Sequence, residues 1–231
     1  MMKLFGLFVV VVSCSDAFVL VPQTKTTCSL KAAASYAEEI ESAKTVLLSA
    51  AETRKEESDK VVDSLLRLEK ACRERARQDP SSSEALMEKL DGSWRLCYTT
   101  GTVDAQKRTG RVNYFPLKAV QSFDFSSKTI ENGIYLFDTP ALRFKGFFDF
   151  DTKNRKLEFD FDTLSLFGFD INLGKKGAAN IGKSTGLGSK SNADLLDKGK
   201  KPFFMWIDAD DAIATARGGG GGLALWKRET S

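Results

Sequence analysis

LRFKGFFDFDTKNRKLEFDFD, residues 142–162, alternates phenylalanine with charged side chains in two short runs. Period-two alternation predicts β-strands with one apolar face and one polar face. The polar residues 151–155 separate the two runs, which favours an antiparallel hairpin. Phe147 is the exception, because it falls on the charged face. A sheet with an aromatic face must cover that face, either with a second layer or by closing on itself.

Short runs of the same kind continue on both sides of this hairpin and predict a mainly β domain. The predicted strands are Trp94 to Thr100, Arg108 to Tyr114, Ala119 to Phe125, Thr129 to Phe137, Ala141 to Phe150, Lys156 to Thr163, Phe167 to Leu173, Phe203 to Asp208, Ala212 to Arg217 and Leu223 to Arg228. Many short strands separated by turns are typical of a barrel or a sandwich. A closed barrel of about eight strands has an interior that side chains just fill or that holds one small ligand. The sequence leaves both outcomes open.

The amino-acid composition argues against several classes of function. The 231-residue chain has 34 basic and 31 acidic residues, a formal charge of +3, and no histidine. So small an excess, without a basic stripe, argues against nucleic acid as a partner. The absence of histidine removes imidazole-dependent triads and the usual zinc and iron sites. We therefore expect no cofactor, no metal and no enzymatic activity.

The amino terminus predicts two targeting segments. Residues 1–17 combine a lysine, a short apolar run and small residues, which is the pattern of a signal peptide. Residues 18–34 contain threonine, serine and lysine but no acidic residue, as transit peptides do. Together they resemble the bipartite presequence of algae whose plastids lie inside extra membranes. Plain secretion is the alternative.

Two of the four cysteines fall within these targeting segments, Cys14 and Cys28. Cys72 and Cys97 remain, one in a predicted helix and one in a predicted strand. A single pair is no disulfide framework, so we interpret both as free, buried thiols in a reducing compartment. One disulfide between them is the alternative.

Residues 35–90 are rich in good helix formers and predict a helical region. Two apolar stripes recur at helical spacing: Ile40, Ala43, Leu47 and Ala50, and then Val61, Leu65, Leu68 and Cys72. After Asp79-Pro80, a short helix is predicted from Glu84 to Leu90. We expect an amphipathic helical pair that packs on the β domain. A helix resting on a membrane surface is the alternative, although it would want more bulky aromatic residues.

LDGSWRLCYTT, residues 90–100, resembles the opening motif of the plastid lipid-associated protein family, also called fibrillins or plastoglobulins. Residues 121–133, 210–218 and 222–228 resemble further stretches of that family. Ala214 stands where the family carries an arginine, and the glycines at 218–222 replace a mixed turn. The likeness extends over about residues 43–228.

This resemblance implies a lipocalin-like antiparallel β-barrel over residues 91–231, preceded by the helical pair. It also implies residence in a plastid, at thylakoids or plastoglobules, and binding of apolar small molecules or membrane lipid. We expect ligand contacts from aromatic residues of the inner face and from polar residues at its rim. The aromatic candidates are Trp94, Phe123, Phe144, Phe148, Phe159, Phe161 and Trp206, and the polar ones are Arg95, Gln121, Asn132 and Arg217.

GAANIGKS, residues 177–184, fits the phosphate-loop pattern, but the glycines and serine that follow it do not form a helix. We therefore expect no nucleotide. Residues 174–202 are rich in glycine, lysine, serine and asparagine, which predicts a long loop at one end of the barrel. Its lysines are candidates for contact with anionic lipid head groups, and a solvated loop is the alternative.

Two functional hypotheses follow. In the first, a plastid protein binds or sequesters carotenoid, prenylquinone or acyl lipid. In the second, the barrel is filled and the protein is a non-catalytic structural or assembly partner of thylakoid membrane complexes. Neither the ligand nor the oligomeric state follows from the sequence.

Overall fold

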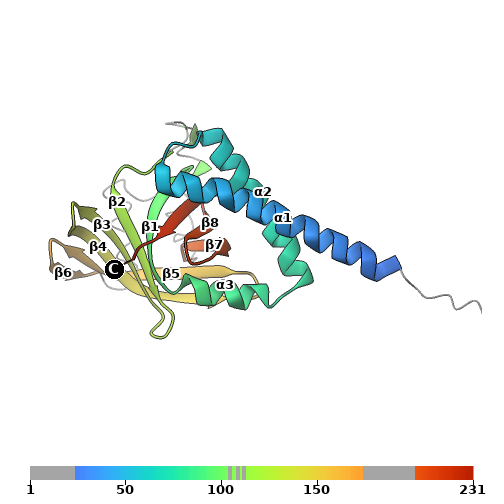
Figure 1. The fold of residues 1–231 in the computed structure, drawn as a ribbon. Coiled ribbons are helices and arrows are strands. Elements are labelled where there is room, and N and C mark those ends of the chain that lie inside the picture. Colours follow the sequence, from blue (N-terminus) through green and yellow to red (C-terminus); the bar gives the residue numbers. More distant parts are fainter. Residues whose placement is uncertain (1–23, 104–105, 108–109, 111–112, 174–200, 231) are drawn as a thin grey trace, which may run out of the picture.

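The protein is described by a computed structural model that covers residues 24–103, 106–107, 110, 113–173 and 201–230. Within these residues it has three helices and nine strands (Figure 1). The helices are α1 (Thr24–Thr53), α2 (Ser58–Gln78) and α3 (Ser82–Leu90). The strands are β1 (Gly92–Thr99), β2 (Lys118–Asp124), β3 (Thr129–Leu136), β4 (Thr139–Asp151), β5 (Lys156–Leu166), β6 (Phe169–Asn172), β7 (Phe203–Ala209), β8 (Ile213–Gly218) and β9 (Leu223–Arg228).

The nine strands form one antiparallel sheet that closes into a ring. Their order is β4-β3-β2-β1-β9-β8-β7-β5-β6, and the additional pairing of β4 with β5 completes the ring. β5 pairs with β7 over residues 156–158 and with β6 over residues 163–166, so β6 is an appendage to the ring. The prediction of a mainly β protein is therefore confirmed.

α1 and α2 pack side by side against the outer face of the ring, over β7, β8, β9 and β1 (Figure 1). Both predicted apolar stripes are buried in this contact: Ile40, Ala43, Leu47, Ala50, Val61, Leu65, Leu68 and Cys72. The strands contribute Tyr98, Ile207, Ile213, Leu223 and Leu225 to the same cluster. The predicted helical pair is thus confirmed, and its apolar faces are covered by the sheet.

Ion pairs fasten the helical pair to the ring. Asp208 of β7 contacts Lys44 of α1 at 2.7 Å and Arg75 of α2 at 2.7 Å. Lys44 also lies 2.9 Å from Asp210. The side chain of Asp208 is only 7% exposed, and the two cations compensate its buried charge.

α3 lies across one end of the ring (Figure 1). Leu86 and Leu90 of this helix belong to the cluster of buried residues that fills the ring interior. The indole N–H of Trp94 donates a hydrogen bond to the Leu90 carbonyl at 2.8 Å. This satisfies one of the carbonyls left unpaired at the helix end. The end of the ring beside α3 is closed by these contacts.

Most predicted strands are found within two residues of their predicted bounds, and β5 continues to Leu166, three residues beyond the predicted Thr163. The strand predicted over residues 108–114 is wrong for the described part, where Tyr114 forms only a single bridge with Tyr98. Pro116 follows it and cannot donate to a ladder. The strand predicted from Phe167 instead begins at Phe169, because residues 167–168 form a turn.

Several predicted segments lie outside the described residues. These are the signal peptide at 1–17, the first residues of the transit segment at 18–23, and residues 174–200 of the predicted loop, which contain the phosphate-loop pattern. α1 begins at Thr24, within the predicted transit segment.

Candidate ligand site inside the strand ring

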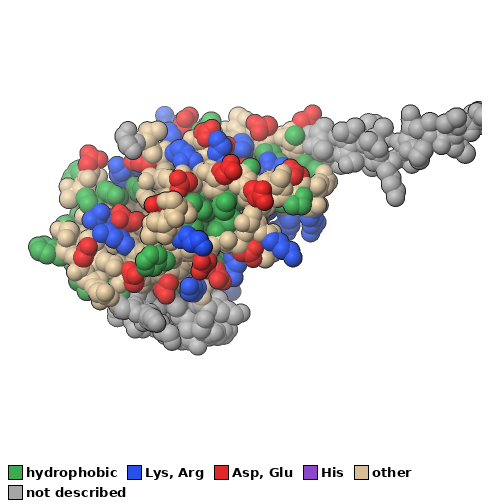
Figure 2. All heavy atoms as spheres, turned by 90° about the horizontal axis from the view of Figure 1, so that it is seen from below, with side chains coloured by type: hydrophobic (Ala, Val, Ile, Leu, Met, Phe, Trp, Pro, Cys, Tyr) green, Lys and Arg blue, Asp and Glu red, His purple; other side chains and the backbone are tan. Residues whose placement is uncertain are grey.

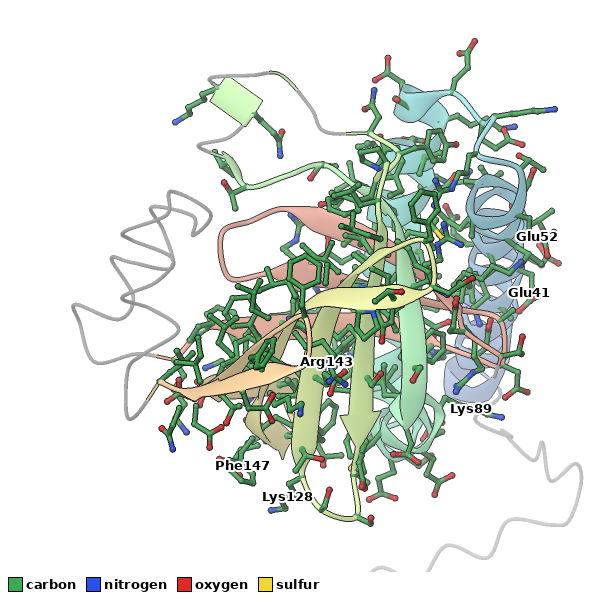
Figure 3. The ribbon with its side chains drawn as sticks, turned by 90° about the vertical axis from the view of Figure 1, so that its left-hand side faces the viewer. Glu41, Glu52, Lys89, Lys128, Arg143 and Phe147 are labelled. Carbon is green, nitrogen blue, oxygen red and sulfur yellow. The ribbon has the colours of Figure 1, made fainter. Side chains whose placement is uncertain are left out.

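The alternation of the central hairpin places its aromatic residues inside the ring. Phe148 pairs with Phe159 across β4 and β5, and both are buried. Phe147, the exception in the sequence pattern, is 59% exposed on the outer face, near Lys128 of the β2–β3 turn (Figure 3). Gly146 allows the two strands to approach, since a Cβ there would lie 1.9 Å from the Asp160 carbonyl oxygen.

The interior next to α3 is densely packed with aromatic side chains. Trp206 lies 5.5 Å from Phe123 and 5.2 Å from Trp226, measured between ring centroids. The Arg228 guanidinium lies 4.1 Å from the centre of the Trp94 ring and donates to the Asp91 carbonyl at 2.9 Å. Each aromatic pair of this kind stabilises the folded state by about 0.5–1.5 kcal/mol beyond the contribution of the buried apolar area. This half of the interior is filled by side chains.

The half of the interior away from α3 is less completely covered. Phe144, Phe161 and Phe204 are only half-buried, although they join the same aromatic network: Phe144 lies 5.6 Å from Phe161 between ring centroids. By strand register and alternation, further half-buried residues share this inner face: Leu96, Ala119, Asn132, Ile134, Leu142, Leu164 and Ala224. Their apolar surface therefore remains partly accessible, unlike the buried aromatic residues near α3.

One polar pair stands on this apolar inner face. Gln121 of β2 is directly opposite Asn132 of β3, and its side-chain amide donates to the Asn132 side-chain oxygen at 2.8 Å. Gln121 is 5% exposed. The bond uses one amide proton of Gln121 and one lone pair of Asn132, so each side chain keeps further donor and acceptor capacity. The arrangement is an apolar wall with one fixed polar group, which is typical of small-molecule sites.

The structure places the predicted site residues in three groups. Trp94, Phe123, Phe148, Phe159 and Trp206 are buried in the packed interior. Phe144 and Phe161 line the half-buried part, and Gln121 and Asn132 stand beside them. Arg95 and Arg217 lie on the outer face of the ring. The inner-face residues Phe204, Trp226, Leu96 and Ile134 were not among the predicted site residues, although the alternation of their strands could have indicated them.

Alternation explains why the two arginines lie outside. Trp94 and Ala216 point into the ring, so their chain neighbours point out of it. Arg217 is bound there by Glu69 of α2, at 2.8 Å from Nε and 2.5 Å from Nη2. Arg95 lines an outer groove of about 310 Å³ together with Arg54 and Lys227. Neither arginine can rim a pocket that opens from the ring interior.

The described outer face of β1 to β4 carries charged side chains in opposite pairs. A second groove, of about 370 Å³, crosses the outer face of β1 to β4 between Ser93, Glu131 and Lys145. Glu131 is partnered by Arg143 at 3.6 Å, and Lys145 by Asp170 at 3.4 Å. On the face seen in Figure 2, basic and acidic side chains are interspersed.

Cys72 and Cys97 are buried and free, as the sequence predicted. Burial raises the pKa of the Cys72 thiol to about 12 and also raises the pKa of Cys97. Among the described residues, no group of three or more His, Cys, Asp or Glu side chains is placed to hold a metal ion. Across the part of the chain that the structure describes, no helix has the length and apolar character to cross a bilayer.

Comparisons of the chain with protein-family models, with curated protein sequences and with solved structures found no match.

Proposed function

We propose that this protein is a non-catalytic carrier that binds one apolar small molecule inside a lipocalin-like β-barrel. The observation that carries the proposal is the contrast in burial along the interior. Trp94, Phe123, Phe148 and Trp206 next to α3 are buried, and only Phe125 and Phe150 at the margin of that cluster are half-buried. At the other end the apolar inner face is half-buried throughout. A ring closed at one end and lined by accessible apolar side chains at the other favours a bound ligand over a completely filled core.

The chemistry of the site narrows the ligand class. Phe144, Phe161 and Phe204 offer flat apolar surfaces to a conjugated or hydrocarbon chain. The Gln121–Asn132 pair offers an amide donor and an amide acceptor to a single hydroxyl or carbonyl group. A long apolar molecule with one oxygen function, such as a carotenoid, a prenylquinone or an acyl lipid, fits this set.

The location is part of the same proposal. The signal-plus-transit composition of residues 1–34 and the resemblance of residues 90–100 to plastid lipid-associated proteins support a plastid, with thylakoid or plastoglobule as the source of ligand. The ligand would then be a membrane constituent of that compartment.

Fluorescence energy transfer from tryptophan to a fluorescent polyene fatty acid tests binding. Trp206 and Trp226 lie in the aromatic network beside the site and serve as donors. Ile134→Trp fills the half-buried inner face of β3, and we expect at least about a tenfold loss of affinity. Glu131→Trp on the outer face of the same strand is the matched control and should bind like the parent protein.

Native mass spectrometry of protein purified from its own plastid, followed by solvent extraction, identifies the natural ligand. A stoichiometric apolar molecule released on denaturation supports the proposal. A ligand-free mass, together with no uptake of carotenoid, quinone or fatty acid, contradicts it.

The second candidate function is a structural or assembly partner of thylakoid complexes. The packed aromatic cluster beside α3 favours it, because that half of the interior already excludes a ligand. In that case Ile134→Trp and Glu131→Trp would behave alike in every uptake assay, and crosslinking in isolated thylakoids would recover a protein partner.

A further inference from the structure

Two neighbouring hairpins place a phenylalanine in a backbone conformation that disfavours it. The β3–β4 turn and the β5–β6 turn contain two residues each, 137–138 and 167–168. Phe137 has φ 58° and Phe167 has φ 46°. Turns of this length favour glycine, asparagine or aspartate at left-handed positions, because a larger side chain is strained there. Arg54, Lys128 and Arg155 also have positive φ, so this conformation alone does not mark a site. The two turns differ from the others because the residue with positive φ is a phenylalanine.

Both phenylalanines are strongly exposed, and so are the apolar residues around them. The exposed fractions are Leu136 49%, Phe137 96%, Leu166 45%, Phe167 62%, Phe169 77% and Ile171 50%. We name these six residues the hairpin-tip surface. Exposed apolar residues that cluster in this way mark an interaction site more often than single, scattered ones do.

The two tips belong to one place in the fold. Leu142 of β4 pairs with Leu166 of β5, which sets the β3–β4 turn beside the β5–β6 turn. Figure 1 shows both turns on the side of the ring away from the helices. β3 runs from the α3 end of the ring to Leu136, so the tips lie at the end where the inner face is half-buried. The hairpin-tip surface therefore adjoins the proposed ligand site.

The charges near the tips are paired. Lys118 lies 3.6 Å from Asp138 and 3.0 Å from Glu229, and Lys145 lies 3.4 Å from Asp170. These charged groups therefore carry no excess positive charge that would attract an anionic surface. The described side chains that project from the tips are aromatic and aliphatic, which favours an apolar partner.

We propose that the hairpin-tip surface is a docking site for a lipid surface, into which Phe137, Phe167 and Phe169 insert. Single side chains that project from narrow hairpin ends can insert among lipid acyl chains. A folded protein partner would instead need a broad complementary face. The inference rests on the proposed function in one respect, which is the use of the docking site for ligand transfer. An apolar ligand could pass from the lipid to the half-buried inner face without crossing water.

Flotation with phosphatidylcholine vesicles, whose zwitterionic head groups carry no net charge, tests the proposal. Phe137→Asn and Phe167→Asn keep a residue that tolerates left-handed backbone but remove the aromatic ring. We expect the double variant to lose at least about tenfold in vesicle affinity. Phe147→Asn is the matched control, because Phe147 is 59% exposed on the outer face of β4 yet lies towards the α3 end. It should float like the parent protein. Binding through uncharged tips should also persist in high salt.

The docking proposal would be contradicted if the parent protein did not float, or if the double variant floated equally well. It would also be contradicted if light scattering showed that the parent protein is a dimer and that the same substitutions make it a monomer. Binding only to anionic vesicles, abolished by salt, would also overturn it and would favour the lysine-rich residues 174–202. The fatty-acid uptake assay separates the two proposals. If the double variant still takes up ligand but does not float, both hold. If no protein takes up ligand while flotation depends on the tips, the docking site stands and the carrier function falls.

Discussion

Arg217 of β8 holds both carboxylate oxygens of Glu69 in α2, at 2.8 Å from Nε and 2.5 Å from Nη2. Its remaining Nη1 donates to the Gly221 carbonyl at 2.8 Å. One side chain thus joins α2, β8 and the β8–β9 turn. The parallel two-point geometry makes this one of the stronger kinds of ion pair, and its role is to fix the helical pair on the ring.

Arg217→Met should lower the free energy of unfolding by about 1–3 kcal/mol at pH 7, because Glu69 would lose its two-point partner while its side chain is only 15% exposed. Arg73→Met is the matched control. Arg73 lies 3.4 Å from the same carboxylate but is 58% exposed, so its loss should cost about 0.5 kcal/mol or less. Urea unfolding followed by circular dichroism measures both. Equal costs would contradict the proposed role of the pair.

The cost of Arg217→Met should depend on pH. The hydrogen bond from Arg217 lowers the pKa of Glu69 below its ordinary value. A carboxyl with a lowered folded pKa stabilises the protein above its unfolded pKa, and this contribution disappears as pH falls through the folded pKa. The difference between parent and variant should therefore be full at pH 7 and shrink below about pH 4. A difference that grows on acidification would contradict the assignment.

Cys72 should be inert in the folded protein. Burial raises the pKa of its thiol to about 12, so the reactive thiolate is scarce at pH 8. In a Cys14→Ser, Cys28→Ser variant, a disulfide reagent should modify neither Cys72 nor Cys97 in buffer and both in guanidinium chloride. Reaction in buffer at the rate of a free thiol would show that this contact between helices and sheet opens readily.

The Gln121–Asn132 pair should behave as a unit. Gln121→Leu alone leaves the Asn132 oxygen without its donor, and we expect a loss of about 1–3 kcal/mol in the free energy of unfolding. The double Leu variant should lose less than the sum of the single variants, with a coupling of about 0.5–3 kcal/mol. Additive losses would mean that the hydrogen bond contributes little.

The same double variant tests ligand selection. It should keep its affinity for a pure hydrocarbon polyene and lose preference for the matching alcohol, because the wall remains apolar and the polar group is gone. If the double variant kept its preference for the alcohol, the ligand oxygen would not bind at the Gln121–Asn132 pair.

Relieving the strained turns should stabilise the protein. Left-handed backbone costs a residue with a Cβ about 1–2 kcal/mol, and Phe137 and Phe167 both adopt it. Phe137→Gly should therefore raise the free energy of unfolding by about 0.5–1 kcal/mol after the greater flexibility of the unfolded chain is subtracted. Thermal unfolding of Phe137→Gly and Phe167→Asn measures this. Destabilisation by either would show that the rings pack within the protein, which would weaken the case for the hairpin-tip surface.

Much of the architecture was predictable because it depends on local periodicity. The alternation in residues 142–162 predicted two strands, their hairpin and the outward position of Phe147. The helical stripes predicted which faces of α1 and α2 are buried. The short segment around Tyr114 was mistaken for a full strand, because alternation alone does not tell whether a neighbour offers a continuous ladder.

The candidate site was only partly predictable. The sequence identified the aromatic inner face and singled out Gln121 and Asn132, which the structure joins by a hydrogen bond. It also grouped Arg217 with them, although Arg217 faces the opposite way and binds Glu69, a residue 148 positions earlier in the chain. Alternation along a strand indicates which face of the sheet a polar residue occupies. Its partner cannot be predicted in this way, because it depends on which helix packs against that face.

Most strands, the helices and the residues that turn inward could be derived from the sequence, since they follow from spacing along a chain with fixed backbone geometry. Closure of the sheet through the pairing of β4 with β5, and the packing of α3 on one end of the interior, could be seen only in the folded structure. It alone brought two strained phenylalanine turns together beside the half-buried inner face. These features depend on contacts between residues far apart in the chain, which local pattern does not specify.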